Sequence, residues 1–203
     1  MESEQGFLKL PLALVGDLVA WWKATGVRGM LIGGAAVSLV GRPRVTRDID
    51  ALVLVDEGRW KAFLAAGEGF KFVPRVNEAL AFARRARTLL VRHKPSVIDV
   101  DISLGALPFE KEAVSRAVLV DAGGLQVPVP TAEDLIIMKV VAQRPRDLAD
   151  VEGILDAQPK LDLRRVRRWV RQFASALERP DIVADLERLI AKRPKTRSRR
   201  KKR

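Results

Sequence analysis

The sequence predicts an α/β protein in which a small sheet flanked by helices is followed by an all-helical C-terminal part. Short apolar segments typical of buried strands alternate with helical patterns over residues 1–130, whereas only helical periodicity continues from residue 131. Pro128 and Pro130 separate the two patterns. With 203 residues and 48% hydrophobic content, the chain is long enough for one packed core with an appendage.

Each expected helix has apolar residues at helical spacing, and each expected strand is a short apolar run bounded by turn residues. In the first part, helices are expected at residues 10–24, 57–66 and 77–87, with a shorter one ending at Gly41. Strands are expected there at residues 30–32, 48–55, 88–91 and 97–103. Later helices are expected at residues 131–143, 146–157, 161–177 and 181–192. We therefore expect a first domain over residues 1–130, a helical subdomain over 131–191 and a tail over 192–203.

Basic residues exceed acidic ones, with 37 Lys and Arg against 25 Asp and Glu, and the net charge is +12. Nine of the twelve residues from 192 to 203 are Lys or Arg, so we expect this tail to be disordered when free. A second concentration lies on the helix expected at residues 161–177 and comprises Arg164, Arg165, Arg167, Arg168 and Arg171. The charge favours a polyanionic partner such as nucleic acid, although a basic tail is also common as a solubility feature.

Several chemistries are excluded by composition. The chain has no Cys and a single His, so it cannot form disulfides, thiolate metal sites or an all-histidine zinc cluster. Any metal would therefore be bound by oxygen ligands. The apolar stretch at residues 7–22 is interrupted by Lys9, Pro11 and Asp17, which fits neither a signal peptide nor a membrane span. We expect a soluble, cytoplasmic protein with no membrane partner.

Two carboxylates begin the strand expected at residues 48–55. Asp48 and Asp50 are at positions i and i+2, so their side chains leave the same face of the strand. Such a pair, together with substrate phosphates, suits Mg²⁺, which prefers hard oxygen ligands. Alternatively, the two residues are solvated at the start of the strand and paired with Arg44 or Arg47.

A second pair of carboxylates repeats the arrangement. Asp99 and Asp101 share one face of the strand expected at residues 97–103. If the two acidic strands are neighbours, one of these residues completes a three-carboxylate site for two metal ions about 3.5–4 Å apart. Such a site is used for in-line phosphoryl or nucleotidyl displacement.

A glycine pair separates the strand expected at residues 30–32 from the following short helix. Gly33 and Gly34 would let backbone N–H groups approach an anion closely, at a helix N-terminus that favours negative charge. Most such pairs are merely turns.

The glycine pair and the first acidic pair together resemble a known motif. Residues 31–34 (Leu-Ile-Gly-Gly), thirteen intervening residues and residues 48–51 (Asp-Ile-Asp-Ala) are similar to the signature of the nucleotidyltransferase superfamily, which includes DNA polymerase beta and the kanamycin nucleotidyltransferases. Residues 41–50, 130–139 and 144–151 further resemble the bacterial branch that contains the AbiEii-type toxins. The resemblance covers roughly residues 30–155.

The resemblance implies a nucleotidyltransferase-like small mixed sheet and assigns roles to individual residues. Gly33 and Gly34 correspond to the triphosphate-binding turn, and Asp48 and Asp50 to the metal ligands. Asp101 is favoured over Asp99 as the third carboxylate because of its spacing to residues 108–110. Many superfamily members carry Ser at the position of Gly34, and its hydroxyl contacts phosphate; here backbone amides would have to replace that contact.

Two basic residues are further candidates for contact with the nucleotide. Lys139 lies in a segment that is apolar nearly all round, so its ammonium either extends to solvent or points toward the nucleotide phosphates, as in similar nucleotidyltransferases. Arg47 either pairs with an acid or reaches toward phosphate.

The resemblance implies an enzyme that transfers a nucleoside monophosphate from an NTP to an acceptor hydroxyl, with Mg²⁺ or Mn²⁺ as cofactor. The basic tail and helix favour RNA, such as a tRNA 3′ end, over a cationic aminoglycoside as the acceptor. Similar toxins suggest a toxin–antitoxin system and a cognate antitoxin partner. Two alternatives remain open at this point: a catalytically silent RNA- or protein-binding module on the same fold, and an enzyme that modifies a protein.

Overall fold

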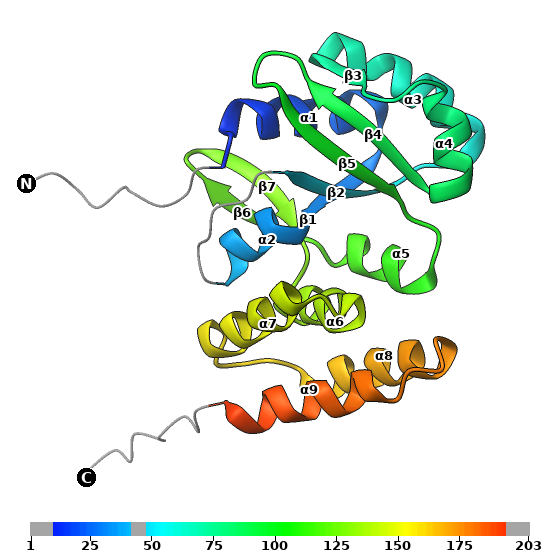
Figure 1. Cartoon of the computed structure of the whole chain (residues 1–203). Coiled ribbons are helices and arrows are strands. Elements are labelled where there is room, and N and C mark those ends of the chain that lie inside the picture. Colours follow the sequence, from blue (N-terminus) through cyan, green and yellow to red (C-terminus); the bar gives the residue numbers. More distant parts are fainter. Residues whose placement is uncertain (1–9, 42–47, 194–203) are drawn as a thin grey trace, which may run out of the picture. The chain divides into compact units, whose positions relative to one another are not determined.

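The computed structural model describes residues 10–41 and 48–193 of the 203-residue chain (Figure 1). The chain divides into two compact units, Met1–Thr131 and Ala132–Arg203, and each is described by itself. The basic tail expected at residues 192–203 lies, from residue 194 onward, outside the described residues.

A five-stranded sheet forms the centre of the first unit, with the strand order β1-β2-β5-β4-β3. The strands, in that order, are Arg28–Ile32, Ile49–Leu54, Ile98–Leu104, Thr88–His93 and Phe72–Pro74. The pair β2–β5 is parallel and the other pairs are antiparallel, so the sheet is mixed. A separate hairpin is formed by β6 (Val118–Ala122) and β7 (Leu125–Val129). The predicted α/β class with a small mixed sheet is confirmed.

Helices flank this sheet (Figure 1). The α-helices of the first unit are α1 (Leu12–Thr25), α2 (Gly33–Val40), α3 (Trp60–Gly67), α4 (Ala79–Ala86) and α5 (Pro108–Ser115). Short 3₁₀ turns occupy Glu57–Arg59 and Glu68–Phe70 on either side of α3. Helix α1 ends at Gly26, whose φ of 64° is the left-handed conformation that glycine adopts most readily.

Aromatic residues form much of the core between α1, α3 and β3. The Trp21 ring stacks on Phe63 and Phe72, with ring centroids 4.4 and 5.3 Å away. The indole N–H of Trp21 donates to the Phe63 carbonyl oxygen at 3.0 Å, so its one polar atom is satisfied in the interior. Trp60 is likewise buried, and its indole N–H donates to the Val55 carbonyl oxygen at 3.0 Å. These tryptophans stabilise the fold and are not available for stacking on nucleic-acid bases.

Three elements of the first unit were not expected from the sequence: β3, α5 and the β6–β7 hairpin. Strand β3 has only 3 residues, and α5 only 8, which is too short for a clear periodicity. Helix α5 is instead defined by its start, where Glu110 accepts hydrogen bonds from the N–H groups of Ala106 and Leu107 at 2.7 and 2.8 Å.

The second unit is entirely helical in the part that the structure describes, as predicted. It consists of α6 (Ala132–Ala142), α7 (Pro145–Ala157), α8 (Leu163–Ala176) and α9 (Asp181–Lys192). Helix α6 packs against the other three. A buried ion pair links α6 to α8, since Arg165 donates to Asp134 Oδ1 from Nε at 2.9 Å and from Nη2 at 2.7 Å.

None of the helices within residues 10–41 and 48–193 combines the length and the apolar character needed to cross a lipid bilayer.

Candidate active site

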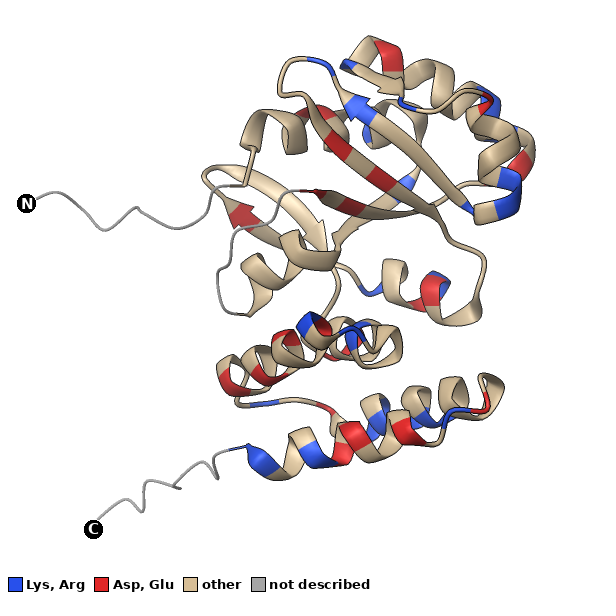
Figure 2. Ribbon diagram, viewed as in Figure 1, with Lys and Arg blue, Asp and Glu red and all other residues tan. Residues whose placement is uncertain are grey.

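The two acidic strands predicted from the sequence are neighbours in the sheet. Strand β2 pairs with β5 in parallel, and Asp50 is in register with Asp101. Paired residues on adjacent strands are about 4.8 Å apart and point to the same face, so the two carboxylates lie side by side. Figure 2 shows acidic residues on both of these strands. Asp48, which is exposed, directly precedes β2 and lies two residues before Asp50.

Gly33 lies directly against Asp50. It follows β1, whose last residue, Ile32, is in register with Asp50 on β2. Gly33 has a φ of +61°, and a Cβ added to it would lie 2.7 Å from Cγ and 2.9 Å from Cβ of Asp50. Glycine is therefore required here both by the left-handed backbone and by the close approach of the carboxylate.

The same glycine starts helix α2. The first backbone N–H groups of a helix have no partner within it, and the helix dipole favours negative charge at this end. Gly34 follows within the first turn and is buried, and its carbonyl oxygen accepts a hydrogen bond from Ser38 Oγ at 3.0 Å. The turn thus brings the start of α2 next to Asp50, which is the arrangement needed to hold a phosphate beside a carboxylate-bound cation.

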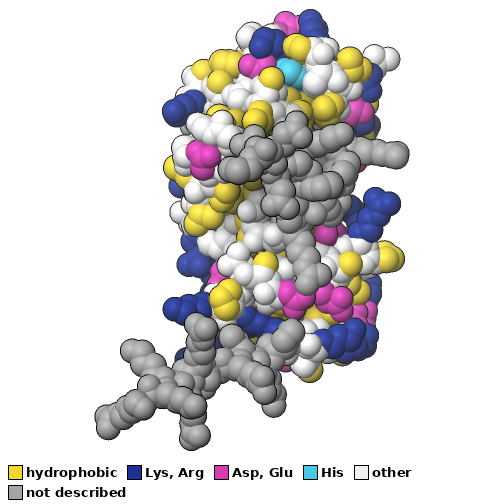
Figure 3. Space-filling model, turned by 90° about the vertical axis from the view of Figure 1, so that its left-hand side faces the viewer, with side chains coloured by type: hydrophobic (Ala, Val, Ile, Leu, Met, Phe, Trp, Pro, Cys, Tyr) yellow, Lys and Arg dark blue, Asp and Glu magenta, His cyan; other side chains and the backbone are white. Residues whose placement is uncertain are grey.

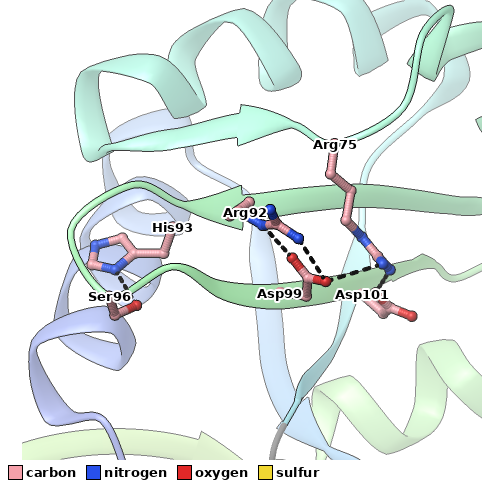
Figure 4. Close-up of polar contacts among 6 residues, drawn as sticks. All are labelled: Arg75, Arg92, His93, Ser96, Asp99 and Asp101. Carbon is pink, nitrogen blue, oxygen red and sulfur yellow. Dashed lines mark hydrogen bonds and ion pairs between the residues drawn. The ribbon is translucent and has the colours of Figure 1, made fainter.

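Two arginines contact the carboxylates of β5 (Figure 4). Arg92, opposite Asp99 on β4, donates to it from Nε at 2.7 Å and from Nη2 at 3.2 Å. Arg75 reaches both acids: Nη1 donates to Asp99 Oδ2 at 3.3 Å and Nη2 donates to Asp101 Oδ1. The hydrogen bond from Arg92 lowers the pKa of Asp99 below its ordinary value; partial burial opposes this effect, and the charges of Arg75 and Arg92 add to it.

These contacts distinguish the two candidates for the third carboxylate. Asp99 is bound by two guanidinium groups and is opposite Arg92, whereas Asp101 is in register with Asp50 and forms an ion pair with Arg75. The side chain of Asp101 is also more exposed, at 41% against 31% for Asp99. The geometry therefore favours Asp101, and its role as a metal ligand stays a prediction.

The donor set is compatible with a divalent cation. Among the described residues, no three acidic or histidine side chains already converge as metal ligands, and Asp101 Oδ1 is directed toward Arg75. However, Asp50 and Asp101 supply hard carboxylate oxygens from adjacent strands, which are the ligands that Mg²⁺ prefers. A divalent cation held by Asp50 and Asp101 would compete with the guanidinium of Arg75 for Asp101.

The remaining predicted site residues are not brought to this sheet by any described contact. Arg47 lies outside the described residues. Lys139 belongs to the second unit, where its buried Nζ is 2.7 Å from Asp147 Oδ1 and 3.0 Å from Asp150 Oδ2. The ammonium is therefore compensated by two carboxylates of α7 and does not extend to solvent. The predicted contact between Lys139 and nucleotide stays a prediction.

The basic face expected on α8 is narrower than the sequence suggested. Arg165 is buried against Asp134, and Arg167 forms a bidentate pair with Glu187 at 2.7 and 2.8 Å. The hydrogen bond from Arg167 lowers the pKa of Glu187, an effect that partial burial opposes. The exposed arginines of α8 are Arg164, Arg168 and Arg171. Acidic and basic side chains lie beside one another on the face of the helical unit seen in Figure 3.

Two polar features were missed by the sequence analysis. Arg75 is the first, because it lies in a loop without a recognisable pattern. The second is the buried His93 at the end of β4, whose Nδ1 is 2.8 Å from Ser96 Oγ and whose Nε2 is 2.9 Å from Asp17 Oδ2. Burial would raise the pKa of Asp17, but hydrogen bonds from Lys71 and His93 outweigh it and lower the pKa. This cluster fixes the β4–β5 turn to α1.

A mixed sheet with in-register carboxylates on neighbouring strands, beside a glycine turn that starts a helix, defines the fold of a nucleotidyltransferase. Solved structures with this fold include the antibiotic-resistance factor ANT(2'')-Ia, with a TM-score of 0.58 and 16% identity over 89% of this chain and 97% of that chain. The lincosamide antibiotic adenylyltransferase LnuA, in its lincomycin-bound form, gives a TM-score of 0.53 and 13% identity over 75% of this chain and 100% of that chain. An antigenic nucleotidyltransferase-like protein from Paracoccidioides brasiliensis has a TM-score of 0.52 and 15% identity, over 90% of this chain and 95% of that chain.

The sequence profile of one protein family matches residues 23–184, and the family is described as "Nucleotidyltransferase of unknown function (DUF6036)". The chain belongs to this family. No curated protein matches the chain. The predicted membership of the nucleotidyltransferase superfamily is thus confirmed, and so is the prediction of an enzyme, whereas the AbiEii-type branch stays a prediction.

Proposed function

We propose that this nucleotidyltransferase transfers a nucleoside monophosphate from an NTP to an acceptor hydroxyl, using Mg²⁺ or Mn²⁺ in the cytoplasm. The observation that carries the proposal is the register of Asp50 with Asp101 beside the glycine turn at Gly33. In the reaction, the acceptor oxygen forms a bond to the α-phosphorus, the bond from that phosphorus to the pyrophosphate oxygen breaks, and pyrophosphate leaves.

The carboxylates and the glycine turn have separate tasks in this proposal. Asp48, Asp50 and Asp101 would hold the divalent ions, which neutralise triphosphate charge and lower the pKa of the attacking hydroxyl. The backbone N–H groups of Gly33 and Gly34 would bind phosphate oxygens at the start of α2. Asp101 would take up the proton of the acceptor hydroxyl or act as a metal ligand.

Arg47 and Lys139 are proposed as further nucleotide contacts. An arginine suits phosphate because its planar guanidinium donates two parallel hydrogen bonds. For Lys139, contact with nucleotide would require the ammonium to exchange at least one of its two carboxylate partners on α7.

RNA, and in particular a tRNA 3′ end, is the acceptor that we propose. The net charge of +12 favours a polyanion and disfavours a cationic acceptor. Arg164, Arg168 and Arg171 are exposed on α8 at positions i, i+4 and i+7, so they share one face of the helix and suit the spacing of a phosphate backbone. Transfer to tRNA would inactivate translation, which is consistent with a toxin held in check by an antitoxin partner.

A small-molecule acceptor is the second candidate function. It is favoured by the shared fold with ANT(2'')-Ia, solved with adenylyl-2''-tobramycin, and with LnuA, solved with lincomycin. The positive charge of the chain argues against an aminoglycoside more strongly than against an uncharged acceptor.

The test is transfer of label from each of the four α-³²P-labelled NTPs, with Mg²⁺ or Mn²⁺, to total RNA, to total protein and to antibiotics in parallel. We expect label at RNA 3′ ends and none with Asp50→Asn. Label on protein alone or on an antibiotic alone would overturn the RNA acceptor and retain the enzyme. Absence of label on every acceptor would overturn the reaction and support a catalytically silent binding module.

A further inference from the structure

Arg75 is anchored at the edge of the carboxylate site. It directly follows β3, and its backbone N–H donates to the Leu90 carbonyl oxygen on β4 at 3.1 Å. From this fixed point the side chain extends over β4 to β5, where its guanidinium contacts Asp99 and Asp101 (Figure 4). The side chain is 27% exposed, so the guanidinium remains accessible to solvent and ligands.

The two contacts of Arg75 differ in how much they are needed. Asp99 already has two hydrogen bonds from Arg92 and is compensated without Arg75. Asp101, in contrast, is next to the carboxylate of Asp50, and like charges directly opposite each other on neighbouring strands destabilise the pair. The guanidinium of Arg75 thus compensates Asp101 from the β4 side of β5, opposite the side on which Asp50 lies on β2.

We propose that Arg75 is a phosphate-binding residue of the active site that serves as the counter-ion of Asp101 until nucleotide binds. When the NTP enters, the guanidinium leaves Asp101 and binds the triphosphate, and Asp101 becomes free to act in the proposed reaction. This inference rests on the proposed function, because it names a further residue of the same site.

The exchange of Asp101 for phosphate as the partner of Arg75 costs little free energy. A partly exposed ion pair contributes little to stability, so its loss is readily offset by new hydrogen bonds. The guanidinium is suited to both partners, since its fork of N–H donors matches carboxylate and phosphate geometry equally well. Because Arg92 keeps Asp99 in place during the exchange, β5 does not have to move.

The test compares Arg75→Gln with the intact protein in two binding measurements. In the first, Mn²⁺ alone is titrated and followed by electron paramagnetic resonance. We expect Arg75→Gln to bind Mn²⁺ about threefold to tenfold more tightly, because the competing cation at Asp101 is gone. In the second, non-hydrolysable α,β-methylene analogues of the four NTPs are titrated in turn with Mn²⁺, and we expect binding about tenfold weaker.

Control variants separate this role from a structural one. Arg84→Gln removes the same charge from an exposed pair with Glu57, and we expect it to change neither affinity. The double variant Arg75→Gln/Asp101→Asn should lose the gain in Mn²⁺ affinity. Arg75→Lys keeps the positive charge but loses the planar set of N–H donors. It should therefore bind Mn²⁺ as tightly as the intact protein does and bind the nucleotide analogues less tightly. This variant replaces Arg75→Gln in the test if Arg75→Gln does not fold.

The outcomes distinguish the inference from the proposed function. If Arg75→Gln matches the intact protein in either affinity, or weakens both, Arg75 is only a structural clip between β3 and β5. The proposed function then still stands on the labelled transfer. If the intact protein binds neither Mn²⁺ nor any analogue and transfers no label, both are overturned.

Discussion

Asp50 and Asp101 occupy the same register position on the parallel strands β2 and β5. The pairing places two acidic side chains at the same position on neighbouring strands, next to Ala51 and Ile102, which are fully buried. Arg75 compensates Asp101 in the structure. A protein retains side-by-side carboxylates of this kind where a cation is to be bound.

Substituting Asn for each of the three strand carboxylates in turn tests how much each contributes to the transfer rate. We expect Asp50→Asn and Asp101→Asn each to lower the transfer rate roughly 10²- to 10⁴-fold, the range typical of a lost acid–base group. Asp99→Asn should cost about tenfold, because Asp99 positions Arg75 and Arg92 and is not in register with Asp50. The rates are measured with labelled NTP at saturating metal. If Asp99→Asn lowers the transfer rate more than Asp101→Asn does, Asp99 is the third carboxylate of the site and Asp101 is not.

The contact between Gly33 and Asp50 predicts the effect of one added methyl group. Gly33→Ala forces a residue with a side chain into a φ of +61°, which costs about 1–2 kcal/mol, and pushes its Cβ into Asp50. We expect loss of nucleotide binding and of activity.

Gly26→Ala is the matched control for this variant. Gly26 has a φ of +64° with no atom within 4 Å of an added Cβ. It should therefore show only the loss of about 1–2 kcal/mol in the free energy of unfolding, with activity unchanged. Equal activities of the two variants would show that the close contact between Gly33 and Asp50 is not needed for activity.

Local patterns made part of this site predictable from the sequence. The glycine pair, the i, i+2 spacing of Asp48 and Asp50 and that of Asp99 and Asp101 all depend on residues close in the chain. The register of Asp50 with Asp101 cannot be predicted from local patterns, because it depends on a parallel pairing between two strands that are far apart in the sequence. Arg75 could not be predicted for the same reason, since its partners on β5 are 24 and 26 residues away.

The fold shows the same division. The longer helices and the apolar strands were predicted to within a few residues, whereas the β6–β7 hairpin was missed although Gly123 and Gly124 form its turn. Pro128 was assigned only to the boundary between the two patterns, and proline lacks an N–H group for the ladder. Among the residues that the structure describes, β7 contains Pro128 and pairs with β6 alone, so this position is tolerated within a two-stranded sheet.

The lowered pKa of Asp99 predicts how acid affects stability. Its folded pKa is below the ordinary value of 3.8, so the contribution of the carboxylate is present above that value and is lost as the pH falls through the folded pKa. The difference in free energy of unfolding between the intact protein and Asp99→Asn should be constant from pH 7 to about pH 5 and shrink below pH 4. Urea unfolding at several pH values measures it. A difference that does not change with pH would mean that Arg92 and Arg75 do not hold the ionised form.

The buried pairing of Lys139 predicts a loss of stability on substitution. Lys139→Met removes the ammonium that bridges the buried carboxylates of Asp147 and Asp150, which should cost about 3–5 kcal/mol in the free energy of unfolding. Restoring part of that stability by adding Asp147→Asn would confirm the structural role. If Lys139 also contacts nucleotide, Lys139→Arg should raise the KM for NTP in a protein of nearly normal stability. A normal KM for this variant would remove Lys139 from the nucleotide site.

Salt dependence tests whether α8 contributes to RNA binding. Each phosphate contact releases counter-ions, so the slope of log K against log salt concentration changes by about 0.7–0.9 for each contact. Replacing Arg164, Arg168 and Arg171 together by Gln should therefore reduce the slope by about 2–3 and weaken RNA binding at low salt. The control is Arg179→Gln, because Arg179 lies outside α8 and its charge is offset by Asp181, to which it donates at 2.8 Å. An unchanged slope in the triple variant would mean that the arginines of α8 are solvated and that RNA, if it is the acceptor, is held elsewhere.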